Sequence, residues 1–502
     1  MNLADLIDRN AAFTPGKPAL RFEGAVWDYA FFACRIAALA RAMQSQLGVH
    51  RGDRVAVLAL NRPDYLALLY ACARLGAMLV PLNWRLAIPE QVFILRDAGV
   101  KAVFVAADFA AVAPLLMQAL PQTRIVHLDD AAGFEALLNA GTGDGREPHV
   151  DFSAPLLIVY TSGTTGRPKG AVLTQQAVFS NGVMSHHMHA MTADDHVLTV
   201  LPFFHVGGLN IQTTPALQLG ATVTIHARFA PGDTLAAIAH DRPTLTGLVP
   251  AAVQALRQHP AWETTDLTCL RAMMTGSSIV PQKLIDAFTD RGVPVVQVYG
   301  ATETCPIAIY TRLGGDLTRP GSTGLPGLLC EARIVDAAGN DVAANVPGEI
   351  LIRGENVLVE YWGNAAATAD GLRDGWYWTG DIAKRDADGY VTVLERKRNV
   401  IISGGENVYP AEIERVLHDH PAVAEAAAIG VPDPRWQEVP LAFVVLRENA
   451  TQGAAELRAH VAAQLARFKL PREIVIVPDL PRNALGKVQH FRLREMWGEE
   501  RG

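Results

Sequence analysis

Short apolar runs alternate with segments of helical length along the first 330 residues of the chain. The run Arg54 to Leu60 indicates a buried strand, and residues 77–82 indicate a second one. Between them, Pro63 can begin a helix that ends near Gly76, which completes a β-α-β unit. Helix-length segments also separate several later strand-like runs, so we expect an α/β fold in which helices cover buried parallel sheets. These later runs lie at residues 197–202, 221–226, 245–250, 270–275 and 293–299.

After about residue 330 the pattern changes to short strands joined by tight turns, as at residues 332–335 and 349–353. This predicts a small β subdomain at about residues 330–395. A dense charged stretch follows, and after it strand-like and helical pieces alternate to the end of the sequence. We therefore predict an N-terminal domain of residues 1–397 and a C-terminal domain of residues 398–502.

Composition and charge exclude several classes of protein. With 502 residues, 50% of them hydrophobic and 19% charged, the chain can bury more than one core and is not mainly disordered. The formal net charge of -7 comes without a block of basic residues, which argues against a nucleic-acid partner. No apolar run approaches the ~18 residues of a membrane span. The five cysteines are scattered and lack CxxC spacing, so we expect neither disulfides nor a zinc site, and a cytoplasmic location.

Residues 160–170 combine glycines, hydroxyls and a lysine directly after an apolar strand-like run. They read Tyr-Thr-Ser-Gly-Thr-Thr-Gly-Arg-Pro-Lys-Gly. Backbone N–H groups, short hydroxyl donors and one mobile cation are what a loop needs to hold phosphate oxygens. The loop is not a Walker A motif, because Lys169 follows Gly166 by three positions and precedes a glycine. A flexible surface turn would explain the glycines and the proline, but not the hydroxyls and the lysine among them.

This loop resembles the phosphate-binding loop of the adenylate-forming superfamily, which includes acyl-CoA synthetases, luciferases and peptide-synthetase adenylation domains. Further motifs follow in that family's order, so the resemblance covers nearly the whole chain. It implies a large N-terminal domain of two doubly wound α/β subdomains plus a small β-barrel-like subdomain, followed by a small mobile α+β C-terminal domain. It also implies that the β- and γ-phosphates of ATP are held by Thr161, Ser162, Gly163, Thr164, Thr165 and Lys169.

Residues 297–304, Gln-Val-Tyr-Gly-Ala-Thr-Glu-Thr, resemble a second family motif. The resemblance implies that Tyr299 stacks on adenine, Thr302 meets the α-phosphate and Glu303 holds magnesium. A hard dication prefers carboxylate and phosphate oxygens, so the chemistry suits this role. Read alone, Glu303 would be a solvated carboxylate after a strand. The implied nucleotide contacts also include Gly300, Ala301, Ser277 and Ser278, the last two in a segment along the adenine and one wall of the acyl pocket.

Tyr-Trp-Thr-Gly-Asp at residues 377–381 resembles the ribose motif of the family. The resemblance implies that Asp381 accepts hydrogen bonds from both sugar hydroxyls, which one fixed carboxylate can do. Arg396 matches an arginine that contacts the nucleotide, and Arg398 falls on the hinge position. Without the motif, these arginines would belong to a solvated charged turn. Many family members have aspartate or lysine at the hinge, so Arg398 is a departure that leaves the hinge energetics open.

Two C-terminal strings complete the resemblance. Residues 402–414 resemble the segment that faces the active site during thioester formation, where Gly404 and Gly405 would allow close approach of the pantetheine arm. Residues 481–488 resemble the loop whose lysine drives adenylation, which implies that Lys487 is catalytic. A lysine this close to a C-terminus would otherwise be a solvated surface charge.

The string Leu-Pro-Phe-Phe-His-Val-Gly-Gly at residues 201–208 resembles the motif whose histidine lies beside the acyl pocket. We expect His205 to gate passage of the thiol, and a general-base role stays open. Room beside this histidine would come from four glycines, Gly207, Gly208, Gly276 and Gly300. The apolar neighbours of the histidine are Val206, Leu209 and Ile307. They favour a hydrophobic acid, and both medium-chain fatty acids and aromatic acids fit.

The resemblance implies an ATP-dependent ligase that forms acyl-AMP and then transfers the acyl group to coenzyme A. Its catalytic set would be Lys487, Thr302, Glu303 and His205, and it would use ATP, Mg²⁺, coenzyme A and a small carboxylic acid. The C-terminal domain would rotate about Arg398 between the two steps. Two alternatives stay open: an acyl-AMP ligase that loads a carrier protein, and a catalytically silent nucleotide-binding homologue. The oligomeric state, a homodimer included, is also open.

Overall fold

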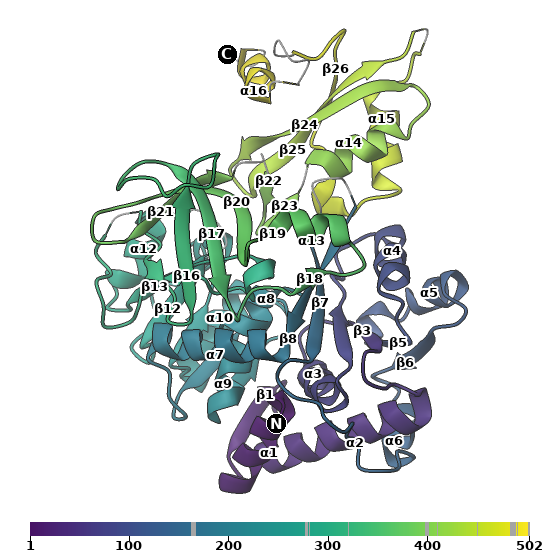
Figure 1. Cartoon of the computed structure of the whole chain (residues 1–502), viewed down its shortest axis with the longest axis vertical. Coiled ribbons are helices and arrows are strands. Elements are labelled where there is room, and N and C mark those ends of the chain that lie inside the picture. The colour runs from purple at the N-terminus through teal and green to yellow at the C-terminus, as the bar shows by residue number, and fades with distance from the viewer. Residues whose placement is uncertain are drawn as a thin grey trace. The chain divides into compact units, whose positions relative to one another are not determined.

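The computed structural model describes residues 1–161, 167–276, 280, 282–319, 321–396, 401–408, 410–448, 450–481, 488 and 490–499. Its chain divides into two compact units. The first comprises Met1–Trp84, Leu95–Val159 and Gly170–Glu395, and the second comprises Arg85–Ile94, Tyr160–Lys169 and Arg396–Gly502. Figure 1 shows the course of the chain through these elements. No helix in the described part of the chain is long and apolar enough to cross a membrane.

A seven-stranded sheet contains the predicted β-α-β unit. Its order is β18 (Glu360–Tyr361), β8 (Lys169–Thr174), β7 (Pro155–Thr161), β4 (Met78–Pro81), β3 (Arg54–Leu58), β5 (Ala102–Val105) and β6 (Arg124–His127). Strands β3 and β4 are parallel, as the pattern predicted, whereas β18 pairs antiparallel with β8. The helices between these strands are α3 (Pro63–Leu75), α4 (Ile88–Ala98), α5 (Ala113–Ala119), α6 (Ala131–Asn139) and the 3₁₀ turn η1 (Ala107–Phe109).

Helix α3 is buried along its whole length. It begins at Pro63 and ends at Leu75, directly before Gly76, whose φ of 62° is the left-handed conformation that commonly follows a helix end. Both bounds confirm the sequence prediction. Helices α1 (Leu3–Phe13) and α2 (Tyr29–Leu47) pack against α3, so the apolar sequence of this helix is covered on more than one side.

A nine-stranded sheet forms the second α/β layer. Its order is β15 (Leu325–Pro326), β14 (Ile309–Tyr310), β13 (Val295–Tyr299), β12 (Ala272–Gly276), β11 (Leu245–Gly247), β9 (His196–Thr199), β10 (Thr222–Ile225), β1 (Pro18–Phe22) and β2 (Ala25–Asp28). The six strands from β13 to β1 are parallel to one another. The intervening helices are α7 (Gln175–His189), α8 (Val206–Gly208), the π-helix η2 (Leu209–Thr213), α9 (Thr214–Leu219), α10 (Pro231–Asp241), α11 (Pro250–Arg257), α12 (Gln282–Thr289) and the 3₁₀ turn η3 (Thr302–Thr304).

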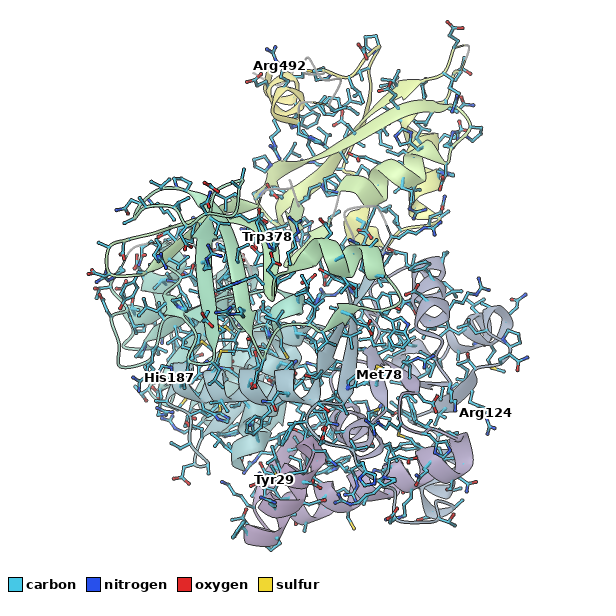
Figure 2. The ribbon with its side chains drawn as sticks, in the orientation of Figure 1. Tyr29, Met78, Arg124, His187, Trp378 and Arg492 are labelled. Carbon is cyan, nitrogen blue, oxygen red and sulfur yellow. The ribbon has the colours of Figure 1, made fainter. Side chains whose placement is uncertain are left out.

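The predicted small β subdomain is an antiparallel sheet of five strands. Strands β16 (Cys330–Val335), β17 (Gly348–Gly354), β20 (Trp376–Arg385) and β19 (Leu372–Arg373) lie in this order, and β21 (Val391–Arg396) pairs with β20. Figure 1 shows β16, β17 and β20 side by side, and Figure 2 marks Trp378 on β20. The short helix α13 (Ala365–Gly371) precedes β19.

The C-terminal segment forms a separate α+β layer. Strands β23 (Glu406–Val408), β22 (Ile401–Ser403), β25 (Gln437–Leu446) and β24 (Val423–Asp433) make one sheet, to which β26 (Ile474–Ile476) adds beside β25. Its helices are α14 (Pro410–His418), α15 (Ala454–Ala462), η4 (Arg467–Lys469) and α16 (His490–Glu499). The α/β class, with two helix-covered parallel sheets, a β subdomain and a small α+β domain, confirms the predicted fold class.

A buried cation holds two parts of the second unit together. Lys469 Nζ lies 2.7 Å from Glu90 Oε1 and 3.0 Å from Glu412 Oε1. Burial alone would lower the pKa of Lys469, but the charges of Glu412 and Glu90 and their hydrogen bonds raise it overall. The lysine therefore stays charged and balances the charge of these two buried carboxylates.

Candidate active site

Tyr299 and Asp381, which the sequence assigns to adenine and ribose, are in direct contact. Tyr299 ends β13 and Asp381 lies in the middle of β20, so the two come from different sheets. The Tyr299 hydroxyl donates a hydrogen bond of 2.8 Å to Asp381 Oδ2. Asp381 is 6% exposed, and a carboxylate so enclosed and bonded keeps one orientation.

Glu303 lies in the turn η3, directly after β13, and is also buried. Its Oε1 accepts a hydrogen bond of 2.8 Å from the hydroxyl of Tyr361. Tyr361 belongs to β18, which pairs with β8 at the edge of the seven-stranded sheet. The second carboxylate oxygen of Glu303, Oε2, forms no hydrogen bond with the described residues, so it can face a cation.

Asn356 holds the turn that carries Glu303. Its Nδ2 donates to the carbonyl oxygens of Thr304 and Ile307 at 3.0 and 2.8 Å. The backbone N–H of Leu358 donates to the Glu303 carbonyl oxygen at 2.8 Å. Since the carbonyl oxygens of Glu303, Thr304 and Ile307 are bonded to residues 356–358, the position of the Glu303 side chain depends on a segment about fifty residues downstream.

The phenol of Tyr377 interacts electrostatically with both carboxylates, Glu303 and Asp381. Its pKa lies well above the ordinary value, first because the phenol is buried and then because Glu303, Tyr361, Tyr299 and Asp381 surround it. The phenol is therefore neutral at physiological pH. Glu303 and Asp381, which the sequence predicted for different parts of one nucleotide, both act on this side chain, so the fold brings them to one site.

The site fits a magnesium ion bound chiefly through its nucleotide. Among the described residues there is no cluster of three or more His, Cys, Asp or Glu side chains that could hold a metal ion. Mg²⁺ commonly takes one or two protein carboxylates and completes its shell with substrate phosphates and water. A single oriented carboxylate, Glu303, matches that pattern.

The loop that carries His205 is held by Asn61, a residue just after β3. Asn61 Nδ2 donates to the carbonyl oxygens of Leu201 and His226 at 2.9 and 3.1 Å, and its Oδ1 accepts from Phe203 N at 2.8 Å. His205 itself precedes α8, and its ring packs against Phe204 with centroids 4.6 Å apart. The predicted gate is thus a packed side chain on a fixed loop.

A cavity lies between α8, η2 and the strands β9, β11 and β12. Its empty volume is about 200 Å³ when the part open to solvent is included, and the described lining is Leu198, Thr199, Val200, Leu201, Gly207, Gly208, Ile211, Gln212, Gly247 and Met274. Two predicted pocket residues, Gly207 and Gly208, are in this lining. A Cβ at Gly207 would meet open space, whereas one at Gly208 would lie 2.3 Å from the Pro202 carbonyl oxygen. Gly207 therefore leaves room, and Gly208 allows the backbone to pack closely.

Gly276 and Gly300 have backbone neighbours. A Cβ at Gly276 would lie 2.3 Å from the Val298 carbonyl oxygen, and one at Gly300 would lie 1.4 Å from that of Pro306. No larger residue fits either position without moving the backbone. The close packing of Gly300 sets the path of the chain between β13 and η3, and that of Gly276 lies where β12 pairs with β13. Their part in the acyl pocket stays a prediction.

Several predicted residues lie at element ends or outside the described part of the chain. Thr161 ends β7 and Lys169 begins β8, while Ala301 and Thr302 lead into η3. Gly404 and Gly405 have φ of 58° and 83° and make the turn between β22 and β23, a conformation that favours glycine. Arg396 ends β21, and its side chain is not described. Outside the described residues lie Ser162, Gly163, Thr164, Thr165, Ser277, Ser278, Arg398 and Lys487.

Two family descriptions match the chain in tandem. "AMP-binding enzyme" matches residues 7–362, and "AMP-binding enzyme C-terminal domain" matches residues 412–487. The chain belongs to the AMP-binding enzyme family. The first match spans most of the chain and includes the turn of Glu303, and the second covers α14 and the segment that leads to Lys487.

Relatives within this AMP-binding family match over the full chain. An indoleacetate–CoA ligase from Aromatoleum aromaticum is 46% identical, covering 99% of this chain and 98% of its own. A feruloyl-CoA synthase from an Amycolatopsis species is 38% identical, covering 98% of each. A solved structure of a double mutant of o-succinylbenzoate CoA synthetase from Bacillus subtilis, bound with a product analogue, has a TM-score of 0.88 at 31% identity and covers 98% of both chains.

Sequence reasoning missed several residues that shape this candidate site. Tyr361, Tyr377 and Asn61 support predicted residues from distant segments, and no local motif marks those contacts. Gln212 and Met274 line the cavity. A signal for Gln212 was available, because it lies four and five residues after two predicted pocket glycines on a helical segment, and such spacing can bring side chains to one face.

Proposed function

We propose that this AMP-binding enzyme is an ATP-dependent, AMP-forming ligase that joins an aromatic carboxylic acid to coenzyme A. The observation that carries the chemistry is the pair of buried carboxylates, Asp381 and Glu303, each bonded by a tyrosine hydroxyl at 2.8 Å. ATP needs an acceptor for its ribose and a magnesium ligand near its phosphates. The choice of acid is supported by relatives named for indoleacetate and ferulate, which are both aromatic acids.

Asp381 would accept hydrogen bonds from the ribose hydroxyls. Its carboxylate is already oriented by Tyr299, so little reorganisation is needed when the nucleotide binds. The ring of Tyr299 would stack on adenine, beside Gly300 and Ala301, and Arg396 would add a contact to the nucleotide. The residues from Thr161 to Lys169 would hold the β- and γ-phosphates.

In the first half-reaction the carboxylate of the acid attacks the α-phosphorus of ATP. Pyrophosphate leaves and acyl-AMP stays. Both reactants are anions, so positioned cations and donors contribute most of the rate. We assign this role to the ammonium of Lys487 and the hydroxyl of Thr302, and magnesium bound by Glu303 and phosphate oxygens would offset the remaining negative charge.

In the second half-reaction the thiol of coenzyme A attacks the acyl carbonyl, and AMP leaves. We assign the approach of the pantetheine arm to the glycine turn at Gly404 and Gly405, and the gate to His205. Rotation about Arg398 between the two steps belongs to this proposal, as does a cytoplasmic location, where ATP and coenzyme A are both available.

The test is acid-dependent pyrophosphate release from ATP, with and without coenzyme A, over matched aromatic and straight-chain acids, with acyl-CoA followed by mass. We expect multiple-turnover release that needs coenzyme A, with aryl-CoA as product. Release without any thioester would favour the carrier-protein alternative, a product only from straight-chain acids would overturn the aromatic assignment, and silence across the panel would contradict catalysis. Asp381→Ala is the negative control.

A further inference from the structure

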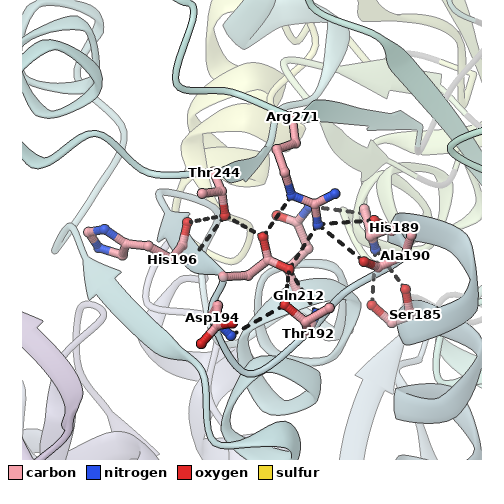
Figure 3. Close-up of polar contacts among 10 residues, drawn as sticks. Ser185, His189, Ala190, Thr192, Asp194, His196, Gln212, Thr244 and Arg271 are labelled. Atoms are coloured by element: carbon pink, nitrogen blue, oxygen red, sulfur yellow. Dashed lines mark hydrogen bonds and ion pairs between the residues drawn. The ribbon is translucent and has the colours of Figure 1, made fainter.

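Gln212 brings a polar group to the cavity beside α8. It lies in η2, is 4% exposed and lines the cavity together with Ile211, Met274 and Gly247. Its Nε2 lies 3.0 Å from Nε2 of His189 and 3.5 Å from the carbonyl oxygen of Thr246. Figure 3 shows Gln212 with His189 and the polar residues around them.

The hydrogen bonds of His189 determine the orientation of the Gln212 amide. Nδ1 of His189 lies 2.9 Å from the carbonyl oxygen of Ser185, which can only accept, so Nδ1 carries the proton. Burial lowers the pKa of His189 to about 4, so the ring is neutral and its Nε2 can only accept. Gln212 must therefore donate to it with its amide nitrogen, and the Gln212 carbonyl oxygen, Oε1, points elsewhere.

Gly247 shows where Oε1 points. A Cβ built at Gly247 would lie 3.3 Å from Gln212 Oε1 and 2.7 Å from Met274 Cε. Gly247 lines the same cavity, so the missing side chain leaves Oε1 uncovered on this wall. The neighbouring wall is apolar, and an acceptor in such surroundings favours a ligand that brings a matching donor.

Thr199 is the other polar side chain among the described lining residues, and its hydroxyl proton already forms a hydrogen bond within the protein. Thr213 Oγ1 donates to the carbonyl oxygen of Gly208 at 2.8 Å, so the 2.6 Å contact between Thr199 and Thr213 is a donation by Thr199. The side chains of this wall therefore offer a ligand one carbonyl acceptor, Gln212 Oε1, next to the apolar side chains of Ile211 and Met274.

We propose that Gln212 determines substrate specificity by accepting a hydrogen bond from a ring N–H of the acid, as in an indole. This inference rests on the proposed function, because it assumes that the cavity holds the aromatic ring of the acid. His189 is a positioning residue that acts through the Gln212 amide. A site built around such a bond rejects an analogue that lacks the donor, since the acceptor would then be buried without a partner.

The test compares kcat/KM for indole-3-acetate with that for benzofuran-3-acetate, in which an oxygen replaces the N–H at nearly constant shape. We expect the wild-type enzyme to prefer indole-3-acetate by roughly tenfold or more. Gln212→Met should bring the ratio close to one. Gln218→Met, a glutamine in α9 outside the cavity lining, is the matched control and should keep the wild-type ratio.

Two results would overturn the inference. Equal kcat/KM for the two acids in the wild-type enzyme would do so without any variant, and so would an unchanged ratio in Gln212→Met. Phenylacetate separates this failure from failure of the proposed function: if neither phenylacetate nor the two bicyclic acids give a CoA thioester, the aromatic-acid assignment is wrong as well. His189→Phe, which lacks the acceptor nitrogen, should lower the ratio in the same direction as Gln212→Met.

Discussion

The hydroxyl of Tyr361 donates a 2.8 Å hydrogen bond to Oε1 of Glu303, although 57 residues separate the two in sequence. Tyr361 is on the edge strand β18 and Glu303 is in the turn after β13, so the bond joins elements of two sheets. An oriented carboxylate binds a cation better than a mobile one, because less ordering remains to be done on binding.

Tyr361→Phe should therefore weaken the response to magnesium. We expect the concentration of Mg²⁺ that gives half-maximal pyrophosphate release to rise about tenfold, as is common when a residue that orients a metal ligand is removed. The measurement is a Mg²⁺ titration at saturating ATP. Tyr70→Phe, at a buried position in α3, is the control, and an identical Mg²⁺ response in Tyr361→Phe would contradict the role given to this bond.

Tyr299→Phe tests the orientation of Asp381. The variant keeps the aromatic ring for stacking but loses the donor to Asp381 Oδ2. We expect KM for ATP to rise roughly tenfold, in keeping with a hydrogen bond to a charged group, and kcat to change less. Tyr299→Leu, which also loses the ring, should raise KM further. If Phe and Leu were equivalent, stacking would not contribute.

Because His189 is buried, we expect the folded protein to lose stability in mild acid. The pKa of His189 falls from 6.5 to about 4 on folding, first because of burial, so the unfolded chain binds the proton more readily. The contribution of neutral His189 to the free energy of unfolding is complete above pH 6.5 and declines as the pH falls toward 4. By pH 5 the free energy of unfolding is lower by about 2 kcal/mol. Urea unfolding at pH 7.5 and pH 5 should show a smaller difference for His189→Gln than for the wild type.

Lys487→Ala should separate the two half-reactions. We expect it to abolish acyl-AMP formation from ATP and to spare thioester formation from supplied acyl-AMP, because the proposed ammonium acts on the α-phosphate only in the first step. The two rates are measured separately, by pyrophosphate release and by acyl-CoA mass. Equal loss of both would contradict this division of roles.

Local sequence predicted the elements well, and the reason is visible in particular segments. Helix α3 begins at Pro63 and ends before Gly76 because proline suits a first helical turn and glycine the left-handed residue that follows a last one. The apolar runs after residues 196, 221, 244, 271 and 294 became strands of one sheet because a strand buried on both faces needs apolar residues throughout.

The motifs also indicated which residues share one site. Tyr299, Glu303 and Asp381 were assigned to one nucleotide, and they lie around the same buried phenol of Tyr377. What the motifs did not contain was the support for these residues. Tyr361 comes from β18, Asn356 from the residues before it, and Asn61 from the end of β3, and none of them has a pattern of its own.

The sequence by itself determined the fold class and the order of the elements and led to the proposal of a nucleotide site, because these follow from local periodicity and from short motifs. Only the tertiary structure decided that β1 pairs with β10, that Tyr361 bonds Glu303, and that His189 turns the Gln212 oxygen toward the cavity. The physical reason is that such contacts depend on long-range pairing and on which buried donors find acceptors, and neither property is carried by the residues next to them in the chain.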